Sequence, residues 1–172
     1  MIQIVGIILI MTACTTAGIY YANKPAFRIK DLKEIKKALI ILHSEIEYTL
    51  TPLPVAIENI SKRIDGHISK IFSDFVVLLK EKRNHDIGEI WLMSLEESKE
   101  KTYFMEEDLE YLISFGKTLG YLDKTLQVNS IALTIKYIED KIEEITLVSL
   151  KNKKLYQTLG VLSGLLICIV LV

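Results

Sequence analysis

The chain has 172 residues, enough for one domain of ordinary size, and 50% of them are hydrophobic although 25% are charged. All 21 basic and 22 acidic residues lie between Lys24 and Lys154. This argues against a soluble enzyme, whose charges would be scattered, and against a disordered protein, which would have few apolar residues. The formal net charge of −1 gives no electrostatic reason to expect a nucleic-acid partner.

The chain begins with an uncharged and mostly apolar run over residues 1–22. At about 1.5 Å per residue, a helix of this length spans roughly the 30 Å hydrocarbon core of a bilayer. The run lacks a charged face, so we predict a membrane helix rather than a buried core helix. A lipoprotein signal cleaved between Ala13 and Cys14 is the main alternative. We favour an uncleaved anchor, because no basic residue precedes the run and the run continues past Cys14.

The first helix of a central body is predicted over residues 28–49. Apolar residues recur there at steps of three and four, which places them on one stripe of a helix. A break at residues 51–54 follows, where Thr51 can cap the next helix and Pro52 suits its first position. The predicted stripe consists of Ile29, Leu32, Ile35, Leu39, Leu42 and Ile46.

Four shorter helices are expected next, and the last of them covers residues 106–119. Gly116 lies inside this helix, where glycine costs about 1 kcal/mol relative to alanine, and therefore predicts a close helix crossing. Gly120 is placed to end the helix in a left-handed conformation. The three earlier helices are expected over residues 52–64, 68–82 and 87–99. The residues predicted to face the core are Ala56, Ile57, Ile60, Ile64, Ile71, Phe72, Phe75, Val76, Leu79, Ile90, Trp91, Leu95, Leu109, Leu112 and Ile113.

A long last helix is predicted to begin at Asp123. Its apolar residues alternate steps of three and four, a heptad-like pattern that indicates a packing seam against another helix. The pattern continues towards Lys154, so the helix can run unbroken into the apolar end of the chain. The seam consists of Val128, Ile131, Ile135, Ile138, Ile142 and Ile145.

A second membrane helix is predicted over the apolar residues 155–172, at the short end of the spanning range. Gly160 and Gly164 have the GxxxG spacing that lets another helix approach closely. The partner of these glycines could be another protein. It could equally be the first span, which offers the small residues Ala13, Ala17 and Gly18.

These elements together predict an all-α protein: an antiparallel bundle of about six helices flanked by two transmembrane helices. The domain boundaries are 1–22, 24–154 and 155–172. Basic residues cluster after the first span, from Lys24 to Lys37, and before the second, from Lys151 to Lys154. The positive-inside rule therefore places the bundle in the cytoplasm.

Signs of catalysis are sparse. The sequence has no nucleotide-binding, zinc-protease or nucleophile-elbow motif, and its three histidines lack ligand-like spacing. An acidic run on the last helix could hold a metal or meet a basic partner, but a solvated face opposite the isoleucine seam is the interpretation we favour. The run consists of Glu139, Asp140, Glu143 and Glu144. We therefore expect no catalytic residue, metal or cofactor, and no small-molecule substrate.

Three blocks of the sequence carry a family resemblance. The first is residues 45–48 followed by Thr51, Pro52, Leu53 and Ala56; the second is Phe115, Gly116, Thr118, Leu119, Gly120, Asp123, Gln127, Ile131 and Leu133; the third is residues 159–166. With the end-anchored layout, these blocks resemble the stage III sporulation protein AB family of spore-forming bacteria over essentially the whole chain.

The resemblance implies a place in a secretion-like channel between the mother cell and the forespore. It implies a location in the outer forespore membrane, with the soluble body on the mother-cell side. It also implies that this body is similar to the cytoplasmic domain of the type II secretion inner-membrane platform protein. The expected partners are the stage III sporulation protein AA ATPase and other stage III sporulation membrane subunits. The family has no known catalytic residues, so none are transferred.

Our leading hypothesis from the sequence is therefore a non-enzymatic platform subunit. A membrane-tethered metal-dependent hydrolase that uses the acidic run is one alternative, and a membrane-anchored sensor or adaptor is another. Gly160 and Gly164 are candidates for helix packing in the membrane. The candidate partner-binding residues, whose clustering core packing could also explain, are Tyr48, Thr51, Pro52, Phe115, Gly116, Gly120 and Asp123.

Overall fold

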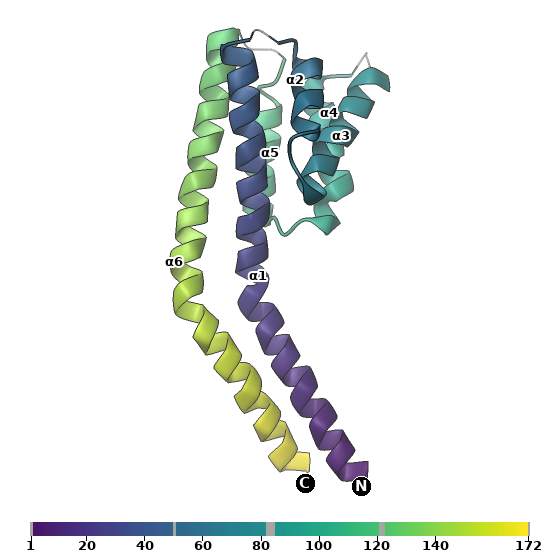
Figure 1. Cartoon of the computed structure of the whole chain (residues 1–172), viewed down its shortest axis with the longest axis vertical. Helices are drawn as coiled ribbons and strands as arrows, with labels where there is room; N and C mark the ends of the chain where they lie inside the picture. The colour runs from purple at the N-terminus through teal and green to yellow at the C-terminus, as the bar shows by residue number, and fades with distance from the viewer. Residues whose placement is uncertain (1, 50, 82–84, 121–122, 172) are drawn as a thin grey trace. The chain divides into compact units, whose positions relative to one another are not determined.

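The structure is a computed structural model that describes residues 2–49, 51–81, 85–120 and 123–171 (Figure 1). Every element in those ranges is a helix, which confirms the all-α class. The elements are α1 (Ile2–Glu47), α2 (Leu53–Ser61), α3 (Gly66–Glu81), α4 (Ile87–Ser98), the 3-10 helix η1 (Lys99–Lys101), α5 (Glu106–Gly116) and α6 (Lys124–Leu171).

The chain divides into two compact units. We call Lys30–Ile142 the bundle unit, and Met1–Ile29 together with Glu143–Val172 the terminal unit. Both α1 and α6 contribute residues to each unit. The prediction that the last helix runs unbroken into the apolar end of the chain is confirmed. The first apolar run is likewise continuous with the first body helix, and Pro25 lies inside α1.

Most of the predicted core of the bundle unit is buried, but Leu79 and Ile113 are half-buried. Four buried apolar residues were not predicted to face the core: Ala38, Ile68, Phe115 and Leu119. Five of the six apolar residues predicted on the first body helix are buried, and Ile29 is half-buried. Each fully buried Leu or Ile contributes roughly 1.5–3 kcal/mol to folding. α3 packs against both α2 and α4, and α4 packs against α5. At the centre, the Trp91 ring lies 5.5 Å from Phe72, 5.3 Å from Phe75 and 6.0 Å from Phe115, between ring centroids.

The seam of α6 is buried at its middle. Ile131 and Ile138 are 0% and 1% exposed, as predicted, and Ile135 is half-buried. The sequence pattern missed Thr134, which is only 2% exposed between the two isoleucines. Its hydroxyl donates to the backbone carbonyl of Ser130 at 2.9 Å, so burial of this polar group leaves no unpaired donor.

Local signals begin and end the helices. Gly120 has φ +87°, which confirms the predicted left-handed residue after α5. Asp123 accepts a hydrogen bond from the backbone N–H of Leu126 at 2.8 Å, which confirms the predicted start of α6. The predicted Thr51 cap is wrong. Pro52 is the N-cap residue of α2 and no side chain caps it, because the Thr51 hydroxyl donates to Glu45 instead.

Within the terminal unit, the beginning of α1 and the end of α6 make a close contact at Gly164. A Cβ atom at Gly164 would lie 3.1 Å from Met11 Sδ and 3.2 Å from Cys14 Cβ. Gly164 therefore packs on the first apolar run, one of the two partners that the sequence left open, and its nearest neighbours there are Met11 and Cys14. The surroundings of Gly160 lie outside the described side chains.

The two predicted membrane helices remain predictions. Over the residues that the structure describes, no helix has the length and apolar character that crossing a bilayer requires.

Candidate partner-contact end of the bundle

Two of the three sequence blocks meet at one end of the bundle unit. The Lys124 ammonium donates to the backbone carbonyl of Glu47 at 2.7 Å and ties the start of α6 to the end of α1. Figure 1 shows these two helix ends together with the start of α2. We call residues 45–49, 51–52, 117–120 and 123–126 the turn end. Segments 77 positions apart in the sequence thus form one surface.

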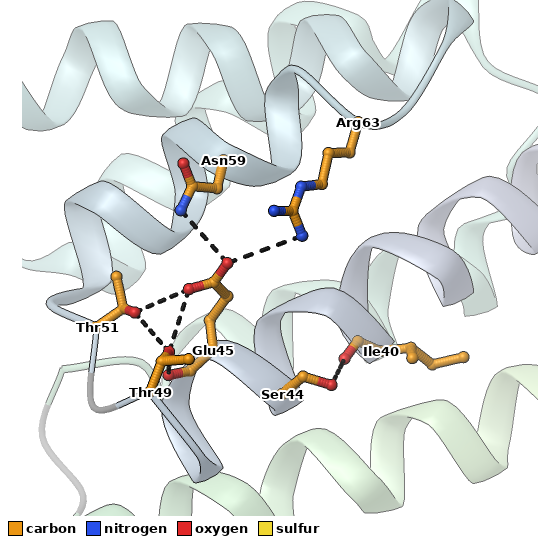
Figure 2. A network of polar contacts seen from close by, with 7 residues as sticks. All are labelled: Ile40, Ser44, Glu45, Thr49, Thr51, Asn59 and Arg63. Atoms are coloured by element: carbon orange, nitrogen blue, oxygen red, sulfur yellow. Dashed lines mark hydrogen bonds and ion pairs between the residues drawn. The ribbon is translucent and has the colours of Figure 1, made fainter.

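The first block is organised around the Glu45 carboxylate (Figure 2). Its Oε2 atom accepts hydrogen bonds from the hydroxyls of Thr51 at 2.8 Å and Thr49 at 3.2 Å. Its Oε1 atom accepts one from the Asn59 amide at 3.3 Å and lies 3.9 Å from the Arg63 guanidinium. The side chain of Glu45 is only 12% exposed. One carboxylate therefore links the end of α1, the connecting segment and α2.

These contacts favour the charged form of Glu45. The Thr51 hydrogen bond has the largest effect in lowering the pKa of Glu45, and Thr49, Asn59 and Arg63 lower it further. Partial burial opposes them but does not outweigh them. This role of Glu45 was not predicted from the sequence, although an acidic residue with threonines four and six positions later is a signal that could have revealed it.

Tyr48 is exposed, and backbone hydrogen bonds lie at it and just after it. The backbone N–H of Tyr48 donates to the Ser44 carbonyl at 3.0 Å, and that of Thr51 donates to the Glu45 carbonyl at 3.2 Å. The Tyr48 side chain is 76% exposed. A large aromatic side chain is therefore presented to solvent on an ordered backbone, and residues of this kind are enriched at protein interfaces.

The second block is organised around Trp91. Its indole N–H donates to the Leu112 carbonyl at 2.7 Å, and its side chain is 0% exposed. A Cβ atom at Gly116 would lie 1.9 Å from Trp91 Cδ1, a distance that excludes any side chain there. The close crossing predicted from Gly116 is therefore confirmed, and its partner is the indole ring on α4.

The turn after α5 is fixed to its neighbours. A Cβ atom at Gly120 would lie 2.4 Å from Ile87 Cδ1, so a side chain would clash there as well as strain the backbone. The Thr118 hydroxyl donates to the Phe115 carbonyl at 2.6 Å and lies 2.8 Å from the Ser130 hydroxyl on α6. The turn thus holds α5 against α6.

The structure places the predicted partner-binding residues in two groups. Tyr48, Pro52, Gly120 and Asp123 are exposed at the turn end, and Thr51 is half-buried beside them. Phe115 is 3% exposed, and Gly116 is buried against Trp91, so core packing explains their presence in the second block. The two buried residues can affect a partner only through the shape of the turn. Two leucines of α6, Leu126 and Leu133, are 51% and 67% exposed but were not among the predicted partner-binding residues, although Leu133 belongs to the second block.

The acidic run on α6 is partly neutralised by lysines. Glu139 lies 3.0 Å from the Lys36 ammonium, and Asp140 lies 2.7 Å from that of Lys136. Among the residues that the structure describes, no group of three metal-ligating side chains is present. These ion pairs agree with a solvated face and give no geometric support to a metal site.

Comparison with known proteins identifies the family. The sequence profile of "Stage III sporulation protein AB (spore_III_AB)" matches residues 3–172. The chain is 30% identical, over 171 residues, to Stage III sporulation protein AB of Bacillus subtilis (strain 168), covering 99% of each chain. A solved structure of Stage III sporulation protein AB matches with a TM-score of 0.66 and 27% identity, covering 72% of this chain and 97% of that one. The chain belongs to the stage III sporulation protein AB family.

Proposed function

We propose that this chain is a non-enzymatic platform subunit of a secretion-like sporulation channel between mother cell and forespore. Membership of the family supports the role in sporulation. In this proposal, the terminal unit anchors the chain in the outer forespore membrane. The bundle unit lies on the mother-cell cytoplasmic side, where it engages the stage III sporulation protein AA ATPase and other stage III membrane subunits.

The surface of the terminal unit supports membrane anchoring. Several large apolar side chains of α6 are exposed there, and no charged residue follows Lys154. Exposing apolar surface to water costs roughly 25 cal/mol of free energy per Å², and contact with lipid removes this cost. The side chains in question are Leu155, Leu159, Leu162, Leu165, Leu166 and Ile169.

The observation that carries the platform role is the ordered display of Tyr48 at the turn end. The side chain is 76% exposed, so the stability of the bundle does not explain it. Two separate polar ties, the Glu45 network and the Lys124 contact to Glu47, hold the backbone around it. A rigid aromatic residue loses little conformational entropy on binding and is a frequent hot spot of protein interfaces.

Tyr48→Ala tests this role. We expect the amount of stage III sporulation protein AA ATPase that co-purifies with the full chain from sporulating cells to fall about tenfold, with a parallel loss of heat-resistant spores. Because Tyr48 is exposed, the free energy of unfolding should change by no more than about 0.5 kcal/mol.

Val77→Ala is the matched control, since Val77 is 50% exposed on α3 and should leave both readouts unchanged. Normal co-purification and normal sporulation of a Tyr48→Ala, Asp123→Ala double variant would refute the assignment of the turn end as the contact surface.

A further inference from the structure

A small hollow lies between the end of α4 and the beginning of α5, away from the turn end. Its volume is about 130 Å³. The apolar part of its lining comes from Leu95 and Leu109, which are 2% and 7% exposed, and from Ile113. Pockets for drug-sized ligands occupy roughly 300–1,000 Å³, so this hollow suits a single side chain rather than a free organic ligand.

The charged part of the lining is mainly acidic. Glu96 comes from α4, Glu106 and Glu110 come from α5, and Lys99 is the one basic side chain among them. The Lys99 ammonium lies 3.7 Å from the Glu106 carboxylate, and the two side chains are 55% and 84% exposed. An ion pair this exposed contributes little to stability, so replacing it with an ion pair to another molecule costs little free energy.

Glu96 and Glu110 are the two carboxylates of the hollow that are available to a partner. Within the described part of the chain, neither carboxylate has an ion-pair partner. They come from different helices, both line the hollow, and both are exposed to solvent. A cation with an aliphatic stem is the chemistry that matches both the lining and the charges.

We infer that this hollow receives one arginine or lysine side chain of a partner protein. The aliphatic stem lies against Leu95 and Ile113, and the charged head lies between the carboxylates of Glu96 and Glu110. An acidic partner would be repelled, and an apolar side chain would bring the two carboxylates close to uncharged surface without a counter-ion. The inference rests on the proposed function in one respect, that the bundle unit works by binding other proteins.

The first test uses butylguanidinium, which has the stem and head of an arginine side chain. It is titrated into the full chain in detergent micelles, with the methyl groups of leucine and isoleucine labelled for NMR. We expect saturable shifts of the Leu95, Leu109 and Ile113 methyl signals, and much weaker shifts with guanidinium or with butanol. In a Glu96→Gln, Glu110→Gln double variant the dissociation constant should rise about tenfold.

Glu97→Gln is the control, because Glu97 is exposed on the same helix and does not line the hollow. Equal shifts with butanol and butylguanidinium, or an unchanged dissociation constant in the double variant, would overturn the inference.

The second test measures heat-resistant spores of cells that carry the same variants. We expect the double variant to lose sporulation while Glu97→Gln retains it, and full sporulation of the double variant would overturn the inference. A loss of self-association by the double variant in sedimentation velocity would also overturn it, since the basic side chain would then come from a second copy of the chain. The NMR titration contains no sporulation partner, so its failure is distinguishable from a failure of the Tyr48 experiment.

Discussion

Two glycines mark close helix contacts, one in each unit, and they differ in what surrounds them. At Gly116 in the bundle unit, an added Cβ would lie 1.9 Å from the Trp91 ring, which its own hydrogen bond to Leu112 holds in place. At Gly164 in the terminal unit, the nearest atoms would be 3.1 and 3.2 Å away, and one of them is the sulfur of the flexible Met11 side chain. A glycine in a sequence therefore indicates a close contact, but the rigidity of the neighbour decides whether a larger residue is tolerated.

A second contrast, within the bundle unit, is that between the contacts of the first and second sequence blocks. Glu45 ties α1 to α2 through hydrogen bonds and charge, whereas Trp91 and Gly116 join α4 and α5 through shape. The stability that the Glu45 contacts provide should depend on pH. The stability of the Trp91–Gly116 contact should instead depend on the volume of the side chain at position 116.

The largest expected effect is that of Gly116→Ala. The methyl group must displace a ring packed among Phe72, Phe75 and Phe115, so we expect a loss of about 3 kcal/mol in the free energy of unfolding, despite the better helix propensity of alanine. Urea denaturation followed by circular dichroism measures this loss. Ser114→Ala, at an exposed position of the same helix, is the control. A loss below about 0.5 kcal/mol would show that the crossing is not tight.

A smaller and pH-dependent effect is expected for Glu45→Gln. The lowered pKa of Glu45 means that its stabilising contribution is complete above the ordinary value of 4.5 and is lost as the pH falls through the lower folded value. Wild-type chain should therefore be more stable than Glu45→Gln at pH 7, and the difference should shrink on acidification towards pH 3. Urea midpoints across this range provide the measurement, with exposed Glu81→Gln as the control. A difference that is the same at both pH values would contradict the role of charge.

The smallest effect on stability is expected at Gly164, so the test there is a cross-link rather than a stability measurement. Gly164→Cys, in a chain with Cys168→Ser, should form a disulfide with Cys14 on mild oxidation. A Cβ placed on Gly164 lies 3.2 Å from Cys14 Cβ, and only a slight widening brings this separation to the usual range of roughly 3.5–4.5 Å. Peptide mapping of the full chain in detergent, without reduction, detects the bond. Gly6→Cys, which has no atom within 4 Å of the added carbon, should not pair with Cys14. Equal bond formation by both variants would mean that Gly164 does not mark a specific contact.

Most of the fold could be predicted from the sequence, because periodic apolar residues and glycine turns act locally. The helix stripe from Leu32 to Ile46, the left-handed Gly120 and the Asp123 cap all followed from such patterns. The sequence also indicated both blocks of the candidate site. It could not show that Phe115 is buried while Tyr48 is exposed, because the two differ in tertiary surroundings and not in local pattern. The failure of the Thr51 cap has the same cause, since Glu45 competes for its hydroxyl from another helix.

The position of Trp91 provides a built-in optical reporter. It is the one tryptophan in the sequence, and it lies among three phenylalanine rings in the bundle unit. When it is excited at wavelengths that tryptophan alone absorbs, its fluorescence emission should therefore follow the opening of the bundle, without a contribution from the tyrosines of the terminal unit. The unfolding of the bundle can thus be followed in intact chains held in detergent or lipid, with no dye and no truncation.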